Sequence, residues 1–407
     1  MRVALVKNIQ TLWLTLFLAL FLVAAGRARA GEELRFAVLY SLDGSERSMS
    51  ESMEKGIRFA LGELNRTGGV DGKRLEAVWV DYAGDLDRLR EETLALVADP
   101  TILAIVGPIR SREVSIFSPE EYDQLEIPTI LPFATMHDLL KGSRFRVRLA
   151  HSDQRQAEAA VAYSLAALDI TRPALVWTKG SVSTSSFSNA VGKLFADSGI
   201  TPSIDYAFPS DDAINDEAEQ KKFFTACQEA DVEMVYLNHV PSYLIEFFRG
   251  AGRFGLKAKF FGTENMDTWD VWMGSGNIIN EACFISASQA EGENRVSLRI
   301  TDFYNRTGEE IDGYSFLGYD AVSVLAESIK QGGADRLAIR DAMHQLQDLL
   351  LASGKVDIGE DGESSRDAYV LQITETEDGF FEPQAVGRYS TDKTLELLTP
   401  DLNSGWD

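Results

Sequence analysis

Short apolar runs alternate with longer amphipathic segments along most of the chain. The first run, 34–40, is typical of a β-strand and ends in a polar turn, after which apolar residues recur every three or four positions over 49–64, on one face of a helix. The pattern predicts further strands at 75–80, 102–106, 129–131, 174–178, 234–237 and 259–262. It predicts further helices at 86–97, from near 111, and at 153–168, 187–195, 216–230 and 242–252.

This alternation of strand and helix is typical of parallel sheets that are covered by helices on both faces. It runs twice, over about 31–148 and about 152–285, and each series is long enough for one lobe. The rest of the chain adds predicted helices at 296–304, 314–329 and 337–351, and strands at 369–373 and near 386. We therefore expect an α/β protein with two doubly wound parallel-sheet lobes, and a C-terminal part that returns to both.

The overall composition narrows the possible partners. Of the 407 residues, 45% are hydrophobic and 25% are charged, as in ordinary globular proteins. Lys and Arg number 39 against 63 Asp and Glu, which gives a formal net charge of −24. Nucleic acid binding depends on basic side chains that neutralise phosphates, so we expect no nucleic acid partner.

The first thirty residues form a segment of their own. A basic start at Arg2 and Lys7 precedes the apolar run 12–25, and Ala28-Arg29-Ala30 has the small-x-small pattern that a signal peptidase recognises. The run is about 14 residues long, shorter than the roughly 20 of a membrane-spanning helix. We expect residues 1–30 to be a signal peptide cleaved after Ala30, which would leave a soluble periplasmic protein. An uncleaved N-terminal anchor is the alternative.

Residues with catalytic or metal-binding chemistry are few. Cys227 and Cys283 belong to no metal motif; they could form one disulfide or be two buried thiols, and the spacing decides neither. The four histidines include no pair at helical spacing, so we expect no metal site. There is no Gly-x-Ser-x-Gly elbow, Gly-rich phosphate loop or paired-His helix, which argues against an exported hydrolase and against any enzyme or cofactor.

Ligands of open parallel sheets bind beyond the carboxyl ends of the strands, in loops that lead into helices. Five predicted loops meet this description, at 41–48, 107–112, 132–137, 178–186 and 262–267. We expect these loops to form one site.

Several segments share their residues with one family. Asn65 to Leu75 reads Asn-Arg-Thr-Gly-Gly-Val-Asp-Gly-Lys-Arg-Leu, a turn whose paired glycines permit positive φ after a helix. Further segments follow in family order: Ile105 to Pro108, Ile127 to Thr135, Ser152 to Gln154, Phe260 to Glu264 and Gly318 to Ala321. From about Leu34 to Gly332 the chain thus resembles the periplasmic solute-binding proteins of branched-chain amino acid ABC transporters, the leucine/isoleucine/valine-binding type.

The resemblance implies a type I periplasmic binding fold, in which two lobes joined by three crossover strands close on a ligand by hinge motion. The crossings are expected near 149–152, 286–290 and 354–362. The expected N-terminal lobe comprises 31–149 plus 288–356, and the C-terminal lobe 150–287 plus 357–407.

The resemblance also implies the ligand contacts. A ligand carboxylate would be held by Ser111, at the start of a helix, and by Thr135; its ammonium would meet the Phe133 carbonyl and the Glu264 carboxylate. Taken singly, Ser111 could be a helix cap and Thr135 a turn residue. Tyr314 matches a pocket aromatic of the family, although Tyr at a helix start also serves simple packing.

The chain departs from the family where the ligand side chain would lie. The aromatic expected after the first strand of the second lobe is replaced by the hydroxyl-rich run 179–186, which includes Ser183, and the next is replaced near Asn238, His239 and Val240. Such a wall suits a polar amino acid or small amide better than leucine, although the serine run could also be a flexible exposed loop. Arg110 and Arg112 flank Ser111, and a structural ion pair with Asp81 or Asp85 is the preferred interpretation.

The leading hypothesis is a periplasmic, monomeric receptor that captures a small amino acid or amide and delivers it to an inner-membrane ABC permease. A ligand sensor of the same fold, acting on a kinase or regulator, is the alternative that the sequence leaves open.

Overall fold

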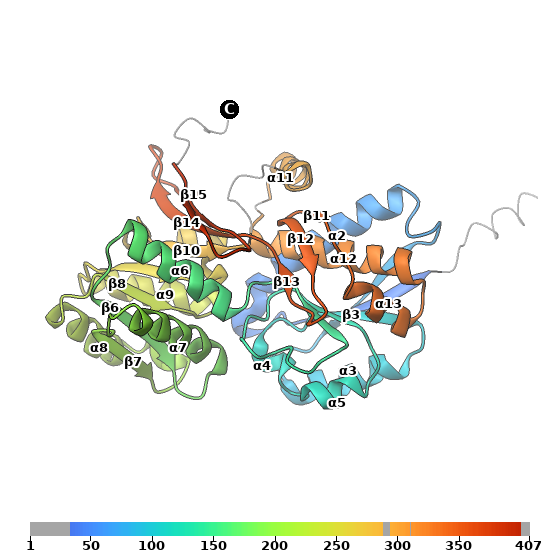
Figure 1. Cartoon of the computed structure of the whole chain (residues 1–407), viewed down its shortest axis with the longest axis horizontal. Helices are drawn as coiled ribbons and strands as arrows, with labels where there is room; N and C mark the ends of the chain where they lie inside the picture. The colour runs from blue at the N-terminus through green and yellow to red at the C-terminus, as the bar shows by residue number, and fades with distance from the viewer. Residues whose placement is uncertain (1–32, 288–293, 310, 400–407) are drawn as a thin grey trace, which may run out of the picture.

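Two separate β-sheets organise the computed structural model, which describes residues 33–287, 294–309 and 311–399 (Figure 1). The first sheet has the strand order β2-β1-β3-β4-β5, and all its pairings are parallel. Its strands are β1 (Leu34–Tyr40), β2 (Leu75–Asp81), β3 (Ile102–Val106), β4 (Thr129–Leu131) and β5 (Arg146–Arg148). β3 and β4 are apolar runs, as expected for strands covered on both faces.

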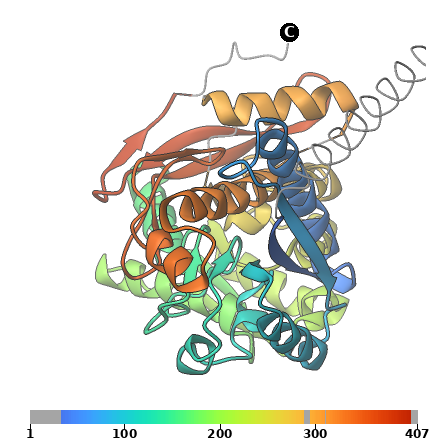
Figure 2. The ribbon, with the colours of Figure 1, turned by 90° about the vertical axis from the view of Figure 1, so that its right-hand side faces the viewer.

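Helices from two distant parts of the chain cover the first sheet. They are α2 (Arg47–Arg66), α3 (Leu86–Ala98), α4 (Ser111–Val114), α5 (Pro119–Asp123), α12 (Gly313–Gly332) and α13 (Arg336–Met343). The long helices α2 and α12 pack against each other over the same core (Figures 1 and 2). Their close approach depends on glycine, because a Cβ atom at Gly56 would lie 1.8 Å from the Ser315 carbonyl oxygen, and one at Gly318 would lie 2.4 Å from that of Met53.

The second sheet has eight strands in the order β16-β15-β14-β10-β9-β8-β6-β7. Its strands are β6 (Pro173–Thr178), β7 (Ile204–Phe208), β8 (Met234–Leu237), β9 (Lys259–Gly262), β10 (Cys283–Ser286), β14 (Ala368–Glu375), β15 (Phe381–Tyr389) and β16 (Leu395–Leu397). β6 to β10 are parallel, whereas β14, β15 and β16 extend the sheet with antiparallel pairings. Two doubly wound α/β lobes were expected and are found, with a mixed second sheet.

The two faces of the second sheet carry different helices. The helices of this lobe are α6 (Asp153–Ala167), α7 (Val182–Asp197), α8 (Glu217–Glu229), α9 (Pro241–Arg253) and α10 (Trp269–Gly274). Cys227 on α8 belongs to the core cluster on one face, whereas Cys283 on β10 belongs to the cluster on the other face. Both cysteines are buried free thiols. Of the two alternatives that the sequence left open, the structure therefore has two buried thiols, separated by the sheet.

The chain passes between the sheets at three places. The first crossing, 149–152, joins β5 to α6 as expected. The second follows β10, but most of its expected range lies among residues 288–293, outside the described residues. The third crossing lies at Arg366 and Asp367, between β13 (Ser364–Ser365) and β14; the expectation of 354–362 was wrong, because that range contains β12 (Gly354–Ile358).

The predicted helix 337–351 was also wrong in its second half. α13 ends at Met343, and Leu349–Leu351 form β11, which pairs with β12 in an antiparallel hairpin that β13 completes as a small sheet. Asp348, at φ 57°, reverses the chain before β11, and its N–H donates to Asp357 Oδ1 at 2.6 Å. The apolar side chains of this segment satisfy a helical period, but the hairpin buries Leu351 and Val356 against α12.

The remaining helix, α11 (Arg295–Thr307), precedes α12. Among the described residues, no helix is both long enough and apolar enough to cross a bilayer.

Candidate ligand-binding site

A small cavity lies between the lobes, at the carboxyl ends of the parallel strands of both sheets. Its wall includes Ser111 and Thr135 from the first lobe, and Ser183, Asp211 and His239 from the second. The cavity volume is about 30 Å³. Because one buried water needs about 10 to 15 Å³, a solute of amino-acid size enters only if the lobes move apart.

Ser111 begins the short helix α4 and binds the neighbouring loop of its own lobe. Its Oγ accepts hydrogen bonds from the backbone N–H groups of Thr135 and Met136, both at 3.1 Å. Both Ser111 and Thr135 line the cavity, so the two residues expected to hold a carboxylate are brought together. Because the Ser111 oxygen already accepts twice, its proton remains for donation to an acceptor in the cavity.

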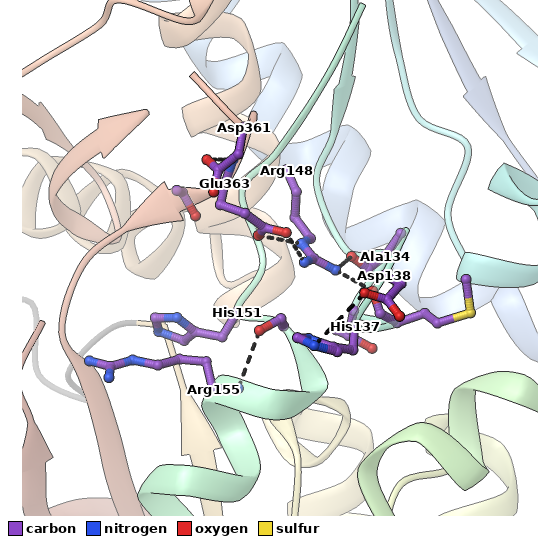
Figure 3. A network of polar contacts seen from close by, with 12 residues as sticks. Ala134, His137, Asp138, Arg148, His151, Arg155, Asp361 and Glu363 are labelled. Atoms are coloured by element: carbon purple, nitrogen blue, oxygen red, sulfur yellow. Dashed lines mark hydrogen bonds and ion pairs between the residues drawn. The ribbon is translucent and has the colours of Figure 1, made fainter. Parts of the chain in front are cut away.

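The loop with Phe133 and Thr135 is held from behind by Arg148 (Figure 3). The fully buried Arg148 guanidinium donates to the carbonyls of Ala134 at 3.3 Å and Met136 at 2.7 Å, and its other nitrogens pair with the Glu363 carboxylate. Glu363 directly precedes β13 and the third crossing. Arg148 therefore links the ligand loop to the hinge.

A second, wider groove of about 710 Å³ lies on the hinge side and includes His151 and Arg155 (Figure 3). Two arginines of its wall have protein partners: Arg155 donates to the carbonyls of Tyr389 and Ser390, and Arg144 pairs with Asp123 at 3.2 Å. The wall also contains His151 Nε2 and Arg366 Nε, which have no hydrogen-bond partner among the described residues. We assign the ligand to the interlobe cavity because that cavity brings Ser111 and Thr135 together.

Asn238 organises the second-lobe side of the interlobe cavity. Its amide nitrogen donates to Asp153 Oδ1 and to the Ser183 carbonyl, both at 3.2 Å. Its amide oxygen accepts from Thr263 Oγ1 at 2.9 Å and from the Asn265 amide at 2.7 Å. All its hydrogen-bonding groups are thereby used, so Asn238 holds the wall in place. Burial raises the pKa of Asp153 to about 6.

His239 is neutral and lies almost completely inside the protein. One ring nitrogen, Nε2, lies 3.0 Å from Thr178 Oγ1, and the other, Nδ1, has no hydrogen-bond partner among the described residues. Burial, together with the charge of Arg110, lowers the pKa of His239 to about 3. The imidazole is therefore a hydrogen-bonding group of the wall and carries no charge at neutral pH.

The serine run that was expected to form a loop at 178–186 is mostly helical. α7 begins at Val182, so Ser183 lies in its first turn, and only Thr178 to Ser181 connect it to β6. Ser183 lines the cavity, but its carbonyl is bound by Asn238. The helix, rather than a flexible loop, presents the hydroxyl groups to the cavity.

Glu264 and Tyr314 line a second, smaller cavity, which shares Phe133 and Asn265 with the first. The Tyr314 hydroxyl donates to Asn265 Oδ1 at 2.7 Å, and its ring meets that of Phe133 edge to face, with centroids 4.8 Å apart. The seven residues expected at the site thus lie in two adjacent cavities, five in the first and three in the second, with Phe133 in both.

The Glu264 carboxyl is buried beside the start of α6. Its Oε1 accepts from the Gln156 amide at 3.2 Å, and its own N–H donates to Gln156 Oε1 at 3.0 Å. Its Oε2 has no hydrogen-bond partner among the described residues. Burial raises the pKa of Glu264 to about 8, an effect that Arg366 opposes and Asp267 reinforces.

The expected pairing of Arg110 with Asp81 or Asp85 was wrong. Arg110 pairs with the buried Glu46 at 2.8 Å, and it lines the cavity. Asp81 instead accepts from the backbone N–H groups of Leu42 and Ala83, and Asp85 caps α3. The other arginine, Arg112, pairs with Glu113 at 3.2 Å and is half exposed. Glu46 lies in the predicted site loop 41–48, but the sequence did not single it out as a partner of Arg110.

Asp211 was missed altogether. It follows β7, whose carboxyl end reaches the same edge as those of its parallel neighbour β6. β7 was not predicted, so the loop after it was not considered. The run Ile204 to Phe208, with its alternating pattern and the Pro209 that ends it, was the signal for an edge strand.

Among the described residues, no group of three His, Cys, Asp or Glu side chains is placed to hold a metal ion. Two hinged α/β lobes with a polar cavity between them define a protein that encloses a small solute. The chain belongs to the periplasmic binding protein family, whose model matches residues 33–379. This match confirms the resemblance seen in the sequence. Members of the family bind solutes and are not enzymes.

Individual relatives agree with this assignment. A Leu/Ile/Val-binding protein of Rhizobium johnstonii is 24% identical over 89% of this chain and 96% of its own length. A leucine-, isoleucine-, valine-, threonine- and alanine-binding protein of Pseudomonas aeruginosa is 21% identical over 78% of this chain and 84% of its own.

Solved structures share the fold at lower identity. A leucine-binding protein of Thermotoga maritima has a TM-score of 0.78 at 20% identity, covering 89% of this chain and all of that one. A solute-binding protein of R. palustris in complex with 4-hydroxybenzoate also has a TM-score of 0.78, at 14% identity, covering 88% of this chain and 97% of that one. Since ligands as different as these occur on one fold, the cavity wall decides what is bound.

Proposed function

We propose that this chain is the solute-binding component of an ABC transporter, which captures a small amino acid or amide-like solute between its lobes and delivers it to an inner-membrane permease. The observation that carries the proposal is the pairing of Ser111 and Thr135 at the wall of an interlobe cavity. The names of the curated relatives, which bind leucine, isoleucine and valine, support an amino acid as the ligand.

The proposed head-group contacts use both cavities. The Ser111 hydroxyl and Thr135 receive the ligand carboxylate, where the start of α4 adds backbone N–H donors. The Phe133 carbonyl and the Glu264 carboxyl receive the ammonium. This arrangement is supported by Phe133, which lies at both cavities, and by Glu264 Oε2, which has no partner within the described part of the chain.

A polar ligand fits the wall better than leucine does. Burying a branched aliphatic side chain gains about 25 cal/mol per Å² only against apolar surface. Here the second lobe presents Ser183, Asp211 and His239, and leaving such groups without partners costs about 1 to 3 kcal/mol each.

The proposed protein is periplasmic and monomeric, with residues 1–30 removed as a signal peptide. The sequence divided the chain into two moving units, 31–149 plus 288–356 and 150–287 plus 357–407. We propose the same two units, but with the last boundary at the crossing formed by Arg366 and Asp367 instead of at 356. A sensor that presents its closed form to a regulator remains the alternative function of the same lobes.

A thermal-shift screen of amino acids, amides, urea and short carboxylates tests the proposal, because a ligand that binds only the native state raises the melting temperature. We expect a polar amino acid or amide to give the largest shift. Failure of every amino acid and amide to shift the melting temperature would contradict the proposal. Uptake of the identified ligand by vesicles that hold the permease separates transport from sensing.

A further inference from the structure

Two carboxyl oxygens at the interlobe cavities have no hydrogen-bond partner within residues 33–287, 294–309 and 311–399. One is Glu264 Oε2, at the small cavity that Tyr314 also lines, and the other is Asp211 Oδ1, at the interlobe cavity that Ser111 lines. Both oxygens are buried. A buried carboxylate oxygen without a donor is costly, so Asp211 Oδ1 calls for an N–H or O–H group from the ligand, and Glu264 Oε2 does so once its carboxyl ionises.

The neighbours of Asp211 do not supply that group. Tyr243, beside it, donates its hydroxyl to the adjacent Asp212 at 3.0 Å. Arg110, which faces Asp211 from the first lobe, already binds Glu46 at 2.8 Å and also lies near the buried Glu113. Glu113 has a second cation in Arg112, at 3.2 Å, whereas Glu46 and Asp211 share the Arg110 guanidinium, so the Asp211 end of the cavity retains an excess of acceptors.

An α-amino acid has one ammonium group, and the proposed function assigns it to Glu264. The second unpartnered oxygen therefore requires a donor elsewhere on the ligand. We infer that the ligand is an α-amino acid whose side chain ends in an N–H donor, such as a carboxamide, ureido or guanidinium group, and that Asp211 is the residue that selects it. This inference rests on the proposed function.

The rest of the wall favours the same class of ligand. The carbonyl of a carboxamide or ureido group can accept from Arg110, and the neutral His239 ring offers Nδ1 as a further hydrogen-bonding atom. An acidic side chain would lie beside Asp211, and the like charges would repel each other. An aliphatic side chain would bury Asp211 without a donor.

Calorimetric titration of the purified protein with glutamine, citrulline, arginine, leucine and glutamate tests whether a side-chain N–H donor strengthens binding. We expect at least one of the first three to bind about tenfold or more tightly than leucine, and glutamate to bind weakest. Comparison of glutamine and citrulline with arginine tells whether the side-chain donor is neutral or cationic. Tighter binding of leucine than of all three would overturn the inference and leave the proposed function standing.

The variant Asp211→Ala provides the second test. We expect this variant to reduce the preference for the best of glutamine, citrulline and arginine over leucine to about threefold or less, while its affinity for leucine stays the same or improves. Asp212→Asn is the matched control, since Asp212 is the exposed neighbour, and it should keep the wild-type preference. An equal loss for leucine and glutamine in Asp211→Ala would show a structural role and reject the inference. Binding of an amide but of no α-amino acid to the wild type would overturn the inference alone. Failure of every α-amino acid and every amide to bind would overturn the proposed function itself, and the inference with it.

Discussion

The Tyr314 hydroxyl donates a hydrogen bond to Asn265 Oδ1 at 2.7 Å, and this bond joins the two lobes beside the candidate site. Tyr314 lies in the first turn of α12, which packs on the first lobe, and Asn265 follows β9 of the second sheet. Asn265 in turn donates to Asn238, the residue that holds the second-lobe wall. Closure of the lobes and the shape of the site are thereby connected through one hydroxyl group.

Removal of this hydroxyl should weaken ligand binding. Tyr314→Phe retains the ring contact with Phe133 but loses a bond that exists only while the lobes are closed, so ligand affinity should fall by about 0.5 to 1.5 kcal/mol, mainly through faster release. Stopped-flow and calorimetry measure both quantities. Tyr206→Phe is the control, since its hydroxyl bonds Glu219 away from the cavity. Unchanged release in Tyr314→Phe would contradict this role.

Glu264 should make stability and binding depend on pH. Its folded pKa of about 8 lies above the unfolded value of roughly 4.3, so the folded state holds the extra proton and its stability falls as the pH rises between these values. Glu264→Gln cannot ionise. Relative to wild type, the ligand-free variant should therefore be more stable at pH 8 than at pH 5, as measured by urea unfolding. An identical pH dependence in the two proteins would rule out this titration.

The same carboxyl should affect the binding of an amino acid. Glu264→Gln should weaken the ligand by about 1.5 to 3 kcal/mol, the range for a hydrogen bond to a charged group. Because Glu264 must ionise to receive an ammonium, binding near pH 7 should release a proton in wild type and none in the variant. Calorimetry in buffers of different ionisation enthalpy measures this release. Unaltered affinity would show that Glu264 lies outside the site or that the ligand carries no cation.

Arg148 should be a major contributor to stability. Arg148→Met leaves the carbonyls of Ala134 and Met136 without their donor, which costs about 1 to 3 kcal/mol for each, and it removes the partner of the Glu363 carboxylate, whose side chain is 33% exposed. The free energy of unfolding in urea measures this cost. Arg144→Met, which removes a 72% exposed guanidinium from its pair with Asp123, should cost about 0 to 1 kcal/mol. Similar costs for both variants would contradict the interpretation.

Both cysteine thiols should be unreactive in the folded protein. Burial raises the pKa of Cys227 and of Cys283 to about 12, so almost no thiolate forms at neutral pH. A thiol reagent such as dithionitrobenzoate should label neither cysteine in the native protein, and both after denaturation without reductant. Labelling of neither cysteine in the denatured protein would indicate a disulfide and contradict the structure.

Export should remove the N-terminal segment. The basic start, the apolar run and Ala28-Arg29-Ala30 predict that the mature protein begins at Gly31 and appears in the periplasmic fraction. Intact-mass spectrometry of the purified protein measures this directly. Retention of residues 1–30 would favour the uncleaved anchor.

The strands were largely predictable because their signal is local. The bounds of β1, β3, β4, β8 and β9 match the expected runs, since a strand covered by helices needs a short apolar segment whatever its neighbours. β7 lies at the edge of its sheet and is only partly buried, so its weak alternation was overlooked, and Asp211 with it. The end of α13 was misplaced because Leu349 to Leu351 satisfy a helical period equally well.

The sequence by itself determined the order of most strands and helices, because these depend on residue type and spacing along the chain. Through its resemblance to one family it also indicated five residues that line the interlobe cavity. Only the tertiary structure decided that Arg110 binds Glu46, that Asp211 faces the cavity, that Glu264 lies beside Gln156, and that a sheet separates the two thiols. These are contacts between segments distant in the chain. A charged or polar side chain has many suitable partners in the sequence, and the packing of the lobes leaves only a few within reach.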